Sequence, residues 1–220
     1  MEELQFIELK AQQIEAFERL QQHVYDQLEH KEQLSTLSHG EIHNILAGNG
    51  MIVGVFTEKR LIAARALLVP DVDEDEHLGK DAGLSRDQLK EVIYQEISLV
   101  HPEYRGRRLQ QQMGEWLNCR LKKEDQPYQY VCATVAPTNL PSMVDKLKQG
   151  MEIVALKEKY GGKLRYIFIK NIKNPSSSFY ETTVDVWLDD HEKQKDLIRL
   201  GYKGVSLKRE NDTYFMVYGM

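Results

Sequence analysis

The stretch Tyr94–Met113 reads YQEISLVHPEYRGRRLQQQM. It predicts a strand over Tyr94–Val100, a basic turn that contains a glycine, and an amphipathic helix over Arg105–Lys122. A turn of this kind directs several backbone N–H groups, and the positive end of the helix dipole, at one point. Such an arrangement suits a pyrophosphate group. The stretch therefore predicts an α/β fold with a phosphate site in its middle.

The segments before this unit alternate between helical and strand patterns. A capping box at Ser38–Glu41 marks the start of one of the helices. The patterns predict a strand over Leu4–Leu9, a helix over Ala11–Leu28, a helix from Ser38 to near Gly48, a hairpin of Met51–Phe56 and Leu61–Val69 joined by Thr57–Arg60, and a short helix over Ser85–Ile93.

The segments after the unit continue the same alternation. They predict a strand over Tyr128–Val135, a helix over Pro141–Gln149 closed by Gly150, and a hairpin of Glu152–Lys157 and Leu164–Lys170. We therefore predict a mixed α/β fold, with a mostly antiparallel sheet and helices on both faces.

A linker-like sequence, Asn174–Ser178, separates this region from a tail. The tail predicts a strand over Thr182–Leu188, a helix over Asp190–Leu200 and a hairpin of Lys203–Leu207 and Thr213–Tyr218. We predict a main domain over residues 1–172 and a small C-terminal β-α-β-β extension over residues 173–220.

The tail resembles an earlier part of the chain. A displacement of 51 residues aligns it with Val131–Lys170 and matches Gly150 with Gly201 and Lys157 with Lys208. One interpretation is that any helix–glycine–hairpin unit looks like this. The other is a partial duplication, which would extend the sheet or form a dimer contact.

The composition limits the classes of function. The chain has 220 residues, of which 41% are hydrophobic, enough for one large domain or a domain with an appendage. Its net charge of −5, and its lack of basic patches interleaved with aromatic residues, argue against a nucleic-acid partner. Cys119 and Cys132 give neither a disulfide framework nor a metal-ligand spacing, so no metal is expected.

The start of the chain, Met1–Leu4, has no basic and apolar segments typical of a signal peptide. No stretch reaches the ~18 apolar residues of a membrane span. We therefore expect a cytoplasmic protein with no membrane partner.

The turn sequence RGRRLQ, Arg105–Gln110, resembles the acyl-CoA motif Q/R-x-x-G-x-G/A of the GNAT superfamily of N-acyltransferases. The order of predicted elements over roughly residues 4 to 170 is also similar to the GNAT order. The resemblance implies that acetyl-CoA is a co-substrate. It implies that the cofactor is bound by Leu99, Val100, Arg105, Gly106, Arg107, Arg108, Leu109, Gln110, Asn139 and Ser142.

Two positions of the turn depart from the motif. Arg108 stands where the first glycine belongs, and Gln110 stands at the position of a small residue. A Cβ at residue 108 can obstruct the approach of a phosphate to the backbone. The guanidinium can instead bond the phosphate oxygens directly. The alternative is an ordinary solvated, basic helix start.

A second departure lies in the helix after the next strand. In GNAT proteins a tyrosine there usually protonates the departing thiolate, and Lys146 replaces it. The lysine can act as the acid or stabilise charge, or it can be an exposed helix lysine without a role.

The resemblance implies that the amine attacks the thioester directly, with no acyl-enzyme. Alternation along the strand places Tyr94, Glu96, Ser98 and Val100 on one face, which makes Glu96 the candidate base. The alternative is that it orients the substrate or is merely a hydrogen-bonded carboxylate. The backbone N–H near Leu99–Val100 is the candidate oxyanion donor.

Other groups are secondary candidates. Tyr160 and Tyr166 are possible acids or packing residues, and His101 is a loop residue or a proton carrier. The acidic run Asp71–Glu76 either attracts an amine substrate or is a solvated loop.

The sequence thus favours an N-acetyltransferase that acts on the primary amine of a small molecule or on an exposed amino group of a protein. The alternative is a non-catalytic, GNAT-like module that binds acyl-CoA or a protein partner. A homodimer is possible.

Overall fold

The computed structural model describes residues 3–31, 34–58, 60–123, 126–175 and 179–220. Residues 1–2, Lys59 of the predicted hairpin turn and residues 176–178 of the predicted linker lie outside the described residues. The chain forms two compact units. The first contains residues 1–70 and 93–126, and the second contains residues 71–92 and 127–220. The predicted boundary at residues 172 and 173 falls inside the second unit and stays a prediction.

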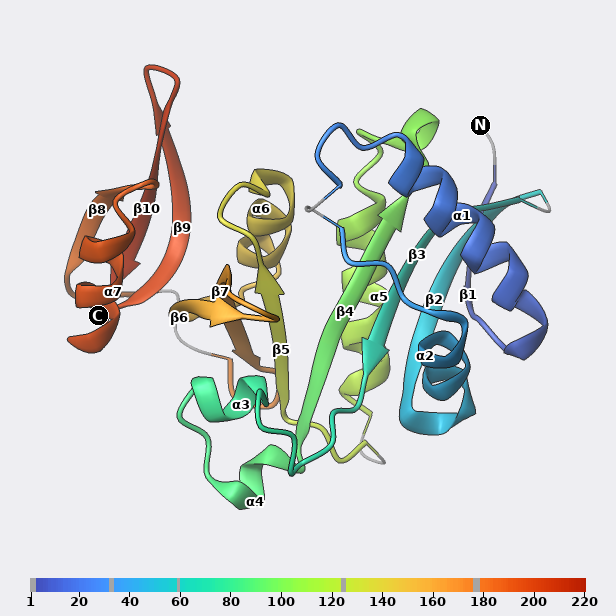
Figure 1. Cartoon of the computed structure of the whole chain (residues 1–220), viewed down its shortest axis with the longest axis horizontal. Coiled ribbons are helices and arrows are strands. Elements are labelled where there is room, and N and C mark those ends of the chain that lie inside the picture. The colour runs from blue at the N-terminus through green and yellow to red at the C-terminus, as the bar shows by residue number, and fades with distance from the viewer. Residues whose placement is uncertain (1–2, 32–33, 59, 124–125, 176–178) are drawn as a thin grey trace. The chain divides into compact units, whose positions relative to one another are not determined.

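The first unit is an antiparallel sheet of four strands in the order β1-β2-β3-β4 (Figure 1). Its strands are β1 (Leu4–Glu8), β2 (Gly50–Thr57), β3 (Arg60–Leu68) and β4 (Val92–Val100). Its helical segments are η1 (Ala11–Gln13), α1 (Ile14–Asp26), α2 (His39–Asn44), η3 (Ile45–Asn49), η4 (Pro102–Tyr104) and α5 (Leu109–Leu121).

Helices cover both faces of this sheet, as predicted (Figure 1). On one face, α1 and α2 form a single apolar cluster with strand residues such as Ile97 and Leu99. On the other face lies α5, which contacts β2 and β3 and buries Leu109, Met113 and Leu117. The spacing of these residues by four positions produces the apolar side of the helix.

The second unit has six strands in the order β5-β7-β6-β9-β10-β8. The strands are β5 (Tyr130–Val135), β6 (Glu152–Lys159), β7 (Lys163–Asn171), β8 (Thr183–Trp187), β9 (Lys203–Glu210) and β10 (Thr213–Gly219). The helices are α3 (Leu78–Asp81), α4 (Arg86–Leu89), α6 (Leu140–Lys148) and α7 (His191–Arg199).

The tail forms the predicted strand, helix and hairpin, and it joins the sheet where β9 pairs with β6. Gly204 of β9 faces Ile153 of β6, and a Cβ on Gly204 would lie 2.9 Å from the Ile153 Cβ. This close approach explains the glycine. The tail therefore extends the sheet within one chain. The possible homodimer stays a prediction.

The predicted repeat extends to structural detail. The bounds of α6 and α7, and of β6 and β9, each differ by 51 residues at both ends (140 to 191, 148 to 199, 152 to 203, 159 to 210). The side chains of Asn139 and Asp190 cap the two helices in the same way. Gly150 and Gly201 close them with φ values of 74° and 94°. Shared caps and closures favour the duplication over a coincidence of hydrophobic pattern.

Gln194 fixes α7 to the strands beneath it. This side chain is fully buried and accepts hydrogen bonds from the hydroxyls of Tyr166 at 2.7 Å and Tyr218 at 3.1 Å. Its amide group donates to the carbonyls of Trp187 and Leu188. Every polar group of the glutamine is thus satisfied, which makes its burial favourable.

Among the described residues, no helix is both long and apolar enough to cross a membrane. The predicted cytoplasmic location stays a prediction.

Candidate functional site: strand β4 and the turn before helix α5

Strand β4 has a bulge at Glu96. The register with β3 pairs Ala66 with Ile97 and Leu67 with Gln95, so Glu96 is the extra residue. A bulge bends its strand and redirects side chains, and bulges are frequent beside active sites. The Glu96 side chain is exposed.

The bulge changes the alternation of side chains along β4. Tyr94, Ile97 and Leu99 pair with every second residue of β3 and therefore share one face. Ser98 and Val100 lie on the opposite face. The prediction that one face holds Tyr94, Glu96, Ser98 and Val100 is therefore wrong, because the extra residue inverts the alternation after Glu96.

The sequence reasoning missed a buried arginine beside the bulge. Arg65 of β3 is fully buried, lies opposite Ser98, and donates its Nε–H to the Ser98 Oγ at 3.2 Å. The signal in the sequence is a single charge within the apolar run of β3. Burial of a charge is unfavourable without polar partners, and this hydrogen bond to Ser98 joins β3 to β4 beside the bulge.

The end of β4 offers one backbone donor away from β3. The N–H of His101 donates to the Ile62 carbonyl of β3 at 2.8 Å. Because N–H directions alternate along a strand, the N–H of Val100 points away from β3 and that of Leu99 points toward it. Of the two predicted donors, Val100 therefore has the geometry to bind a ligand.

The turn that follows contains two residues in left-handed conformation. After η4, Arg105 is extended, Gly106 has a φ of 79°, and Arg108 has a φ of 57° and a ψ of 25°. Arg108 is the residue before the helix, so α5 starts at Leu109 rather than at the predicted Arg105. The difference arises because two left-handed residues interrupt the helical backbone.

The first turn of α5 presents backbone donors. The first helical hydrogen bond runs from the Gln112 N–H to the Arg108 carbonyl at 3.1 Å. The N–H groups of Leu109, Gln110 and Gln111 consequently have no acceptor within the helix. They lie at the positive end of the helix dipole, where an anion is stabilised.

The arginines of the turn surround these donors with positive charge. The side chains of Arg105, Arg107 and Arg108 are all exposed. The Arg107 guanidinium lies over the Tyr104 ring, 4.8 Å from its centroid. Among the described residues, the Arg108 side chain forms no capping hydrogen bond with the helix. Backbone and side chains thus make this turn the candidate site for a phosphate-bearing ligand.

His101, just before the turn, is buried at 4% exposure. Burial lowers the pKa of His101 below its usual value, and the neighbouring Arg60 lowers it further. A neutral ring bonded to an arginine fits a positioning role better than the predicted proton transfer.

The remaining predicted site residues lie in the second unit. The Asn139 side chain accepts a hydrogen bond from the Ser142 N–H at 3.1 Å, which caps α6. Lys146 is buried, and its Nζ lies 3.4 Å from an Asp145 carboxylate oxygen, to which Gln149 also donates at 2.9 Å. The interpretation of Lys146 as an exposed helix lysine is therefore wrong.

Solved structures with this arrangement of elements are numerous. No family model and no curated protein matches the sequence. NAA60 from Arabidopsis thaliana, in complex with acetyl-CoA, aligns with a TM-score of 0.61 at 14% identity, over 78% of this chain and 100% of its own. The ribosomal-protein-S18-alanine N-acetyltransferase from Escherichia coli aligns with a TM-score of 0.58 at 12% identity, over 81% and 99%. A GNAT-family acetyltransferase from Streptococcus pneumoniae gives a TM-score of 0.56 at 15% identity, over 77% and 99%.

The chain has the GNAT fold. The predicted fold class is confirmed. At these identities the likeness concerns the fold, so the chemistry has to be argued from the residues of this chain.

Tyr166, on β7 of this GNAT fold, is unsuited to act as an acid. Burial raises the pKa of its hydroxyl well above the usual value, and that hydroxyl already donates to Gln194. Tyr160 lies in the β6–β7 turn with 50% of its surface exposed. The predicted role of Lys146 in stabilising the thiolate charge stays a prediction.

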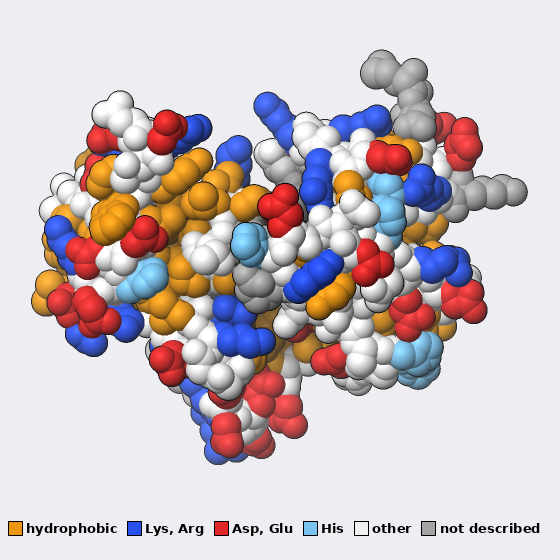
Figure 2. All heavy atoms as spheres, turned by 45° about the horizontal axis from the view of Figure 1, so that its top comes forward, with side chains coloured by type: hydrophobic (Ala, Val, Ile, Leu, Met, Phe, Trp, Pro, Cys, Tyr) orange, Lys and Arg blue, Asp and Glu red, His pale blue; other side chains and the backbone are white. Residues whose placement is uncertain are grey.

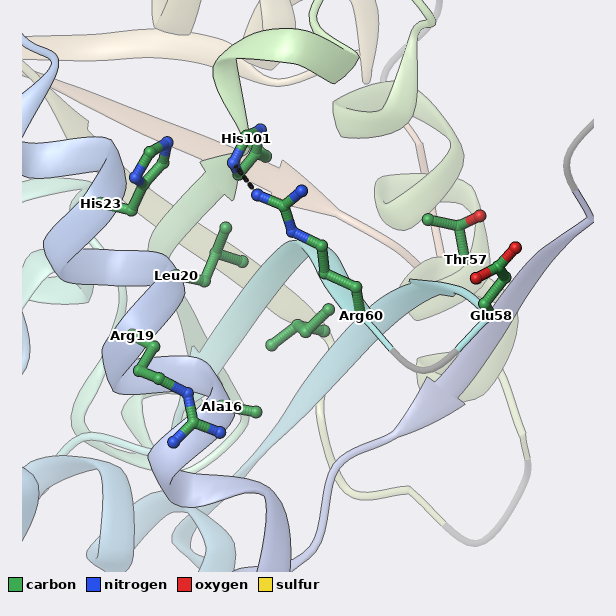
Figure 3. A pocket seen from close by; sticks show the side chains of 9 residues that line it. Ala16, Arg19, Leu20, His23, Thr57, Glu58, Arg60 and His101 are labelled. Atoms are coloured by element: carbon green, nitrogen blue, oxygen red, sulfur yellow. Dashed lines mark hydrogen bonds between the residues drawn. The ribbon is translucent and has the colours of Figure 1, made fainter.

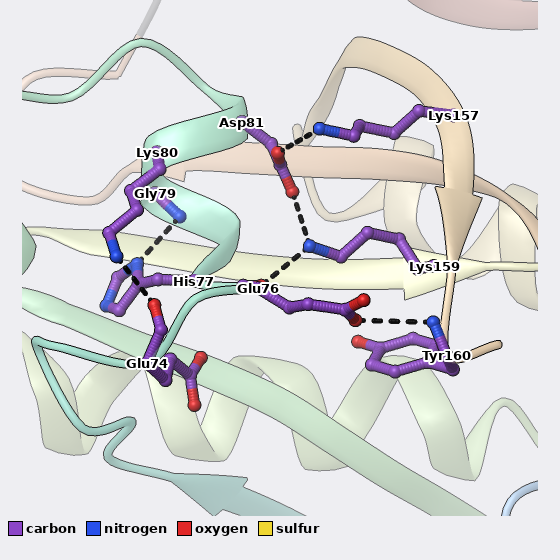
Figure 4. A network of polar contacts seen from close by, with 9 residues as sticks. All are labelled: Glu74, Glu76, His77, Gly79, Lys80, Asp81, Lys157, Lys159 and Tyr160. Carbon is purple, nitrogen blue, oxygen red and sulfur yellow. Dashed lines mark hydrogen bonds and ion pairs between the residues drawn. The ribbon is translucent and has the colours of Figure 1, made fainter.

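The acidic run Asp71–Glu76 is held to the second unit by polar contacts (Figure 4). Asp73 pairs with Arg86 at 2.8 Å. Glu76 accepts the Tyr160 N–H at 3.2 Å, and its carbonyl accepts from Lys159 at 2.7 Å. These contacts favour a structural role for the run over the attraction of a free amine.

The second unit also contains a pocket of about 450 Å³ with a mixed lining. Its apolar residues include Pro137 of the β5–α6 loop, Leu140 of α6, and Trp187 of the extension, and its polar residues include Asp189 and His191. Figure 2 shows hydrophobic side chains gathered on this face over the extension. Trp187 is 53% exposed there.

Proposed function

We propose that this protein is an N-acetyltransferase that binds acetyl-CoA and acetylates a primary amine of a small molecule or an exposed amino group of a protein. The pyrophosphate of the coenzyme is bound by the turn Arg105–Gln110. The observation that supports this most directly is the left-handed conformation of Arg108. The turn keeps the backbone geometry that a glycine would serve, although the residue is an arginine.

That geometry has an energetic consequence. A left-handed conformation costs a non-glycine residue roughly 1–2 kcal/mol, and such strain is retained most often at functional sites. In return, the backbone turns so that the N–H groups of Leu109, Gln110 and Gln111 face outward together. The guanidinium of Arg108 adds a second source of phosphate contacts.

Three groups of the chain are assigned to the chemistry. Glu96 removes a proton from the attacking ammonium, and the bulge sets its direction. The Val100 N–H donates to the oxyanion that forms as nitrogen bonds to the thioester carbon. The C–S bond then breaks, and the ammonium of Lys146 stabilises the negative charge of the leaving thiolate. Asn139 and Ser142 are assigned to the cofactor through their place at the start of α6.

A non-catalytic role is the second candidate, and the environment of Lys146 favours it. A buried lysine beside Asp145 is already neutralised by its neighbour. Such a pair serves packing as well as chemistry. The turn would then bind acyl-CoA without turnover.

Thermal-shift titrations with acetyl-CoA and with desulfo-CoA test whether the cofactor binds. We expect Arg105→Glu to raise the Kd at least about 10-fold, because a carboxylate replaces a charge-assisted donor beside the phosphate. Arg199, on α7, is also exposed, so Arg199→Glu is the control and should leave the Kd unchanged. An unaltered Kd in Arg105→Glu would refute the assignment of the pyrophosphate to this turn.

A thiol-release assay against a panel of amines separates the two functions. Glu96→Gln should lower turnover and leave the Kd for acetyl-CoA unchanged. Normal turnover in this variant would remove Glu96 from the mechanism. Tight cofactor binding without thiol release from any amine, in the parent protein, would establish the non-catalytic role instead.

A further inference from the structure

A pocket of about 580 Å³ lies in the first unit between α1 and the β2–β3 hairpin (Figure 3). Arg19 and His23 come from one side of α1, and Arg60 reaches across from the start of β3 toward His101. The proposed acetyl transfer uses none of these side chains.

Both arginines of the pocket have weak partners. Arg19 pairs with Glu15 at 3.3 Å, with side chains 72% and 83% exposed. Arg60 pairs with Glu103 at 3.7 Å, with side chains 56% and 71% exposed. Ion pairs this exposed contribute about 0–1 kcal/mol each. A ligand anion can therefore replace either carboxylate at little cost.

Arg60 is nevertheless oriented. Its NH2 group hydrogen-bonds the Nε2 of His101, a ring that is buried in the fold. The His101 ring stacks on the ring of His23 with centroids 4.4 Å apart and planes 7° from parallel. The stack holds the guanidinium at the mouth of the pocket, which reduces the entropy lost when an anion binds.

The rest of the lining narrows the class of ligand. Leu20 and Leu61 are buried and form an apolar floor. Glu58 also lines the pocket, and Glu15 and Glu103 pair with the two arginines, so the surroundings carry no excess positive charge. A planar guanidinium matches a carboxylate through two parallel hydrogen bonds. A ligand that displaces one of these carboxylates from its arginine exchanges one negative charge for another, which suits a monoanion with a hydrocarbon body.

We infer that this pocket, lined by Arg19 and Arg60, is a binding site for a small organic monocarboxylate that places its apolar part on Leu20 and Leu61. The inference does not rest on the proposed acetyl transfer. The site adjoins the proposed coenzyme turn, because the His101 ring lies 5.8 Å from the ring of Tyr104 and Arg107 lies over that same Tyr104 ring.

The test is an NMR titration of the full chain with sodium benzoate at constant ionic strength, followed through the imidazole signals of His23 and His101. Benzamide, which has the same shape without the charge, is the matched probe. We expect saturable, millimolar binding of benzoate, at least 10-fold weaker binding of benzamide, and at least a 10-fold loss of benzoate affinity in Arg19→Gln and in Arg60→Gln. Arg60→Lys keeps the charge but loses the planar pair of guanidinium donors, so its benzoate affinity should lie between those of Arg60→Gln and the parent protein.

Arg86→Gln is the control variant, because Arg86 forms a similarly exposed ion pair with Asp73 outside this pocket. Its benzoate affinity should equal that of the parent protein. Each variant is first checked for parental thermal unfolding. Equal binding of benzoate and benzamide, equal affinity for inorganic phosphate, unchanged benzoate affinity in both arginine variants, or no saturable shift at all would each overturn the inference.

Discussion

The substitution Asp81→Asn removes the negative charge from a buried ion-pair cluster in the second unit (Figure 4). The Asp81 carboxylate pairs with Lys159 at 2.8 Å and with Lys157 at 2.6 Å. The side chains of Asp81 and Lys159 are only 8% and 3% exposed, whereas that of Lys157 is 49% exposed. After the substitution, the buried ammonium of Lys159 keeps the Glu76 carbonyl but loses its counter-charge.

The magnitude follows from this burial. Removal of one partner from a buried ion pair destabilises a protein by about 3–5 kcal/mol, because the other charge stays buried without compensation. Asparagine keeps the volume and one acceptor, so we expect the lower end, about 3 kcal/mol. For a chain of this size, that corresponds to a fall in Tm of roughly 6–12 °C.

Urea unfolding followed by circular dichroism measures the change, with an unaltered m-value as the check on two-state behaviour. The double variant Asp81→Asn/Lys159→Met should recover about 2 kcal/mol or more, because no buried charge remains. Lys157→Met, which removes the exposed partner of the same carboxylate, should change stability by about 1 kcal/mol or less. A loss under about 1 kcal/mol in Asp81→Asn, or no recovery in the double variant, would refute the reasoning.

Three further predictions concern other parts of the chain. The free energy of unfolding of Arg108→Gly should exceed that of Arg108→Ala by about 1 kcal/mol, because only glycine adopts the left-handed conformation without steric cost. Equal urea midpoints for the two variants would contradict this. Burial lowers the pKa of His77, so the neutral ring contributes to stability above the ordinary histidine pKa, and this contribution is lost as the pH falls below that value. Between pH 7.5 and 5.5, the free energy of unfolding should therefore fall more in the parent protein than in His77→Asn. Equal falls in the two proteins would contradict this prediction. Gln194→Leu should lower the free energy of unfolding by about 3 kcal/mol and raise the rate of amide hydrogen exchange in β10, because the hydroxyls of Tyr166 and Tyr218 lose their acceptor. An unchanged exchange rate in β10 would exclude a role of Gln194 in holding this strand.

The fold was predictable because its signals are local and repeated. The capping box at Ser38 gives the start of α2 within one residue, and the glycines at 150 and 201 mark the ends of α6 and α7. The match at an offset of 51 residues could be read from these glycines and the hairpin residues alone. What the pattern did not provide was α3, whose four residues are too few for a periodic signal.

The candidate site can be proposed from the sequence, but its geometry cannot. The basic turn at Arg105–Gln110 can be read from residue types, since arginines and a glycine after a strand favour a phosphate site. The bulge at Glu96 cannot, because the extra residue is defined by the register with β3, a partner distant in sequence. The burial of Lys146 depends in the same way on packing that the helical pattern of α6 does not encode.

Arg108 shows why a missing motif glycine does not by itself remove a function. A motif records the residue that most easily adopts a required conformation, but the conformation is what positions the N–H groups. At residue 108 the left-handed backbone is present with an arginine, and the first N–H groups of α5 have no acceptor within the helix. Under the proposed function, the arginine therefore adds a charge to the turn, while a backbone conformation that suits phosphate binding is present. Lys146 differs from Arg108, because a change of side chain at residue 146 changes the proposed reacting group itself. The choice between a transferase and a non-catalytic acyl-CoA-binding module therefore depends on this lysine more than on the turn.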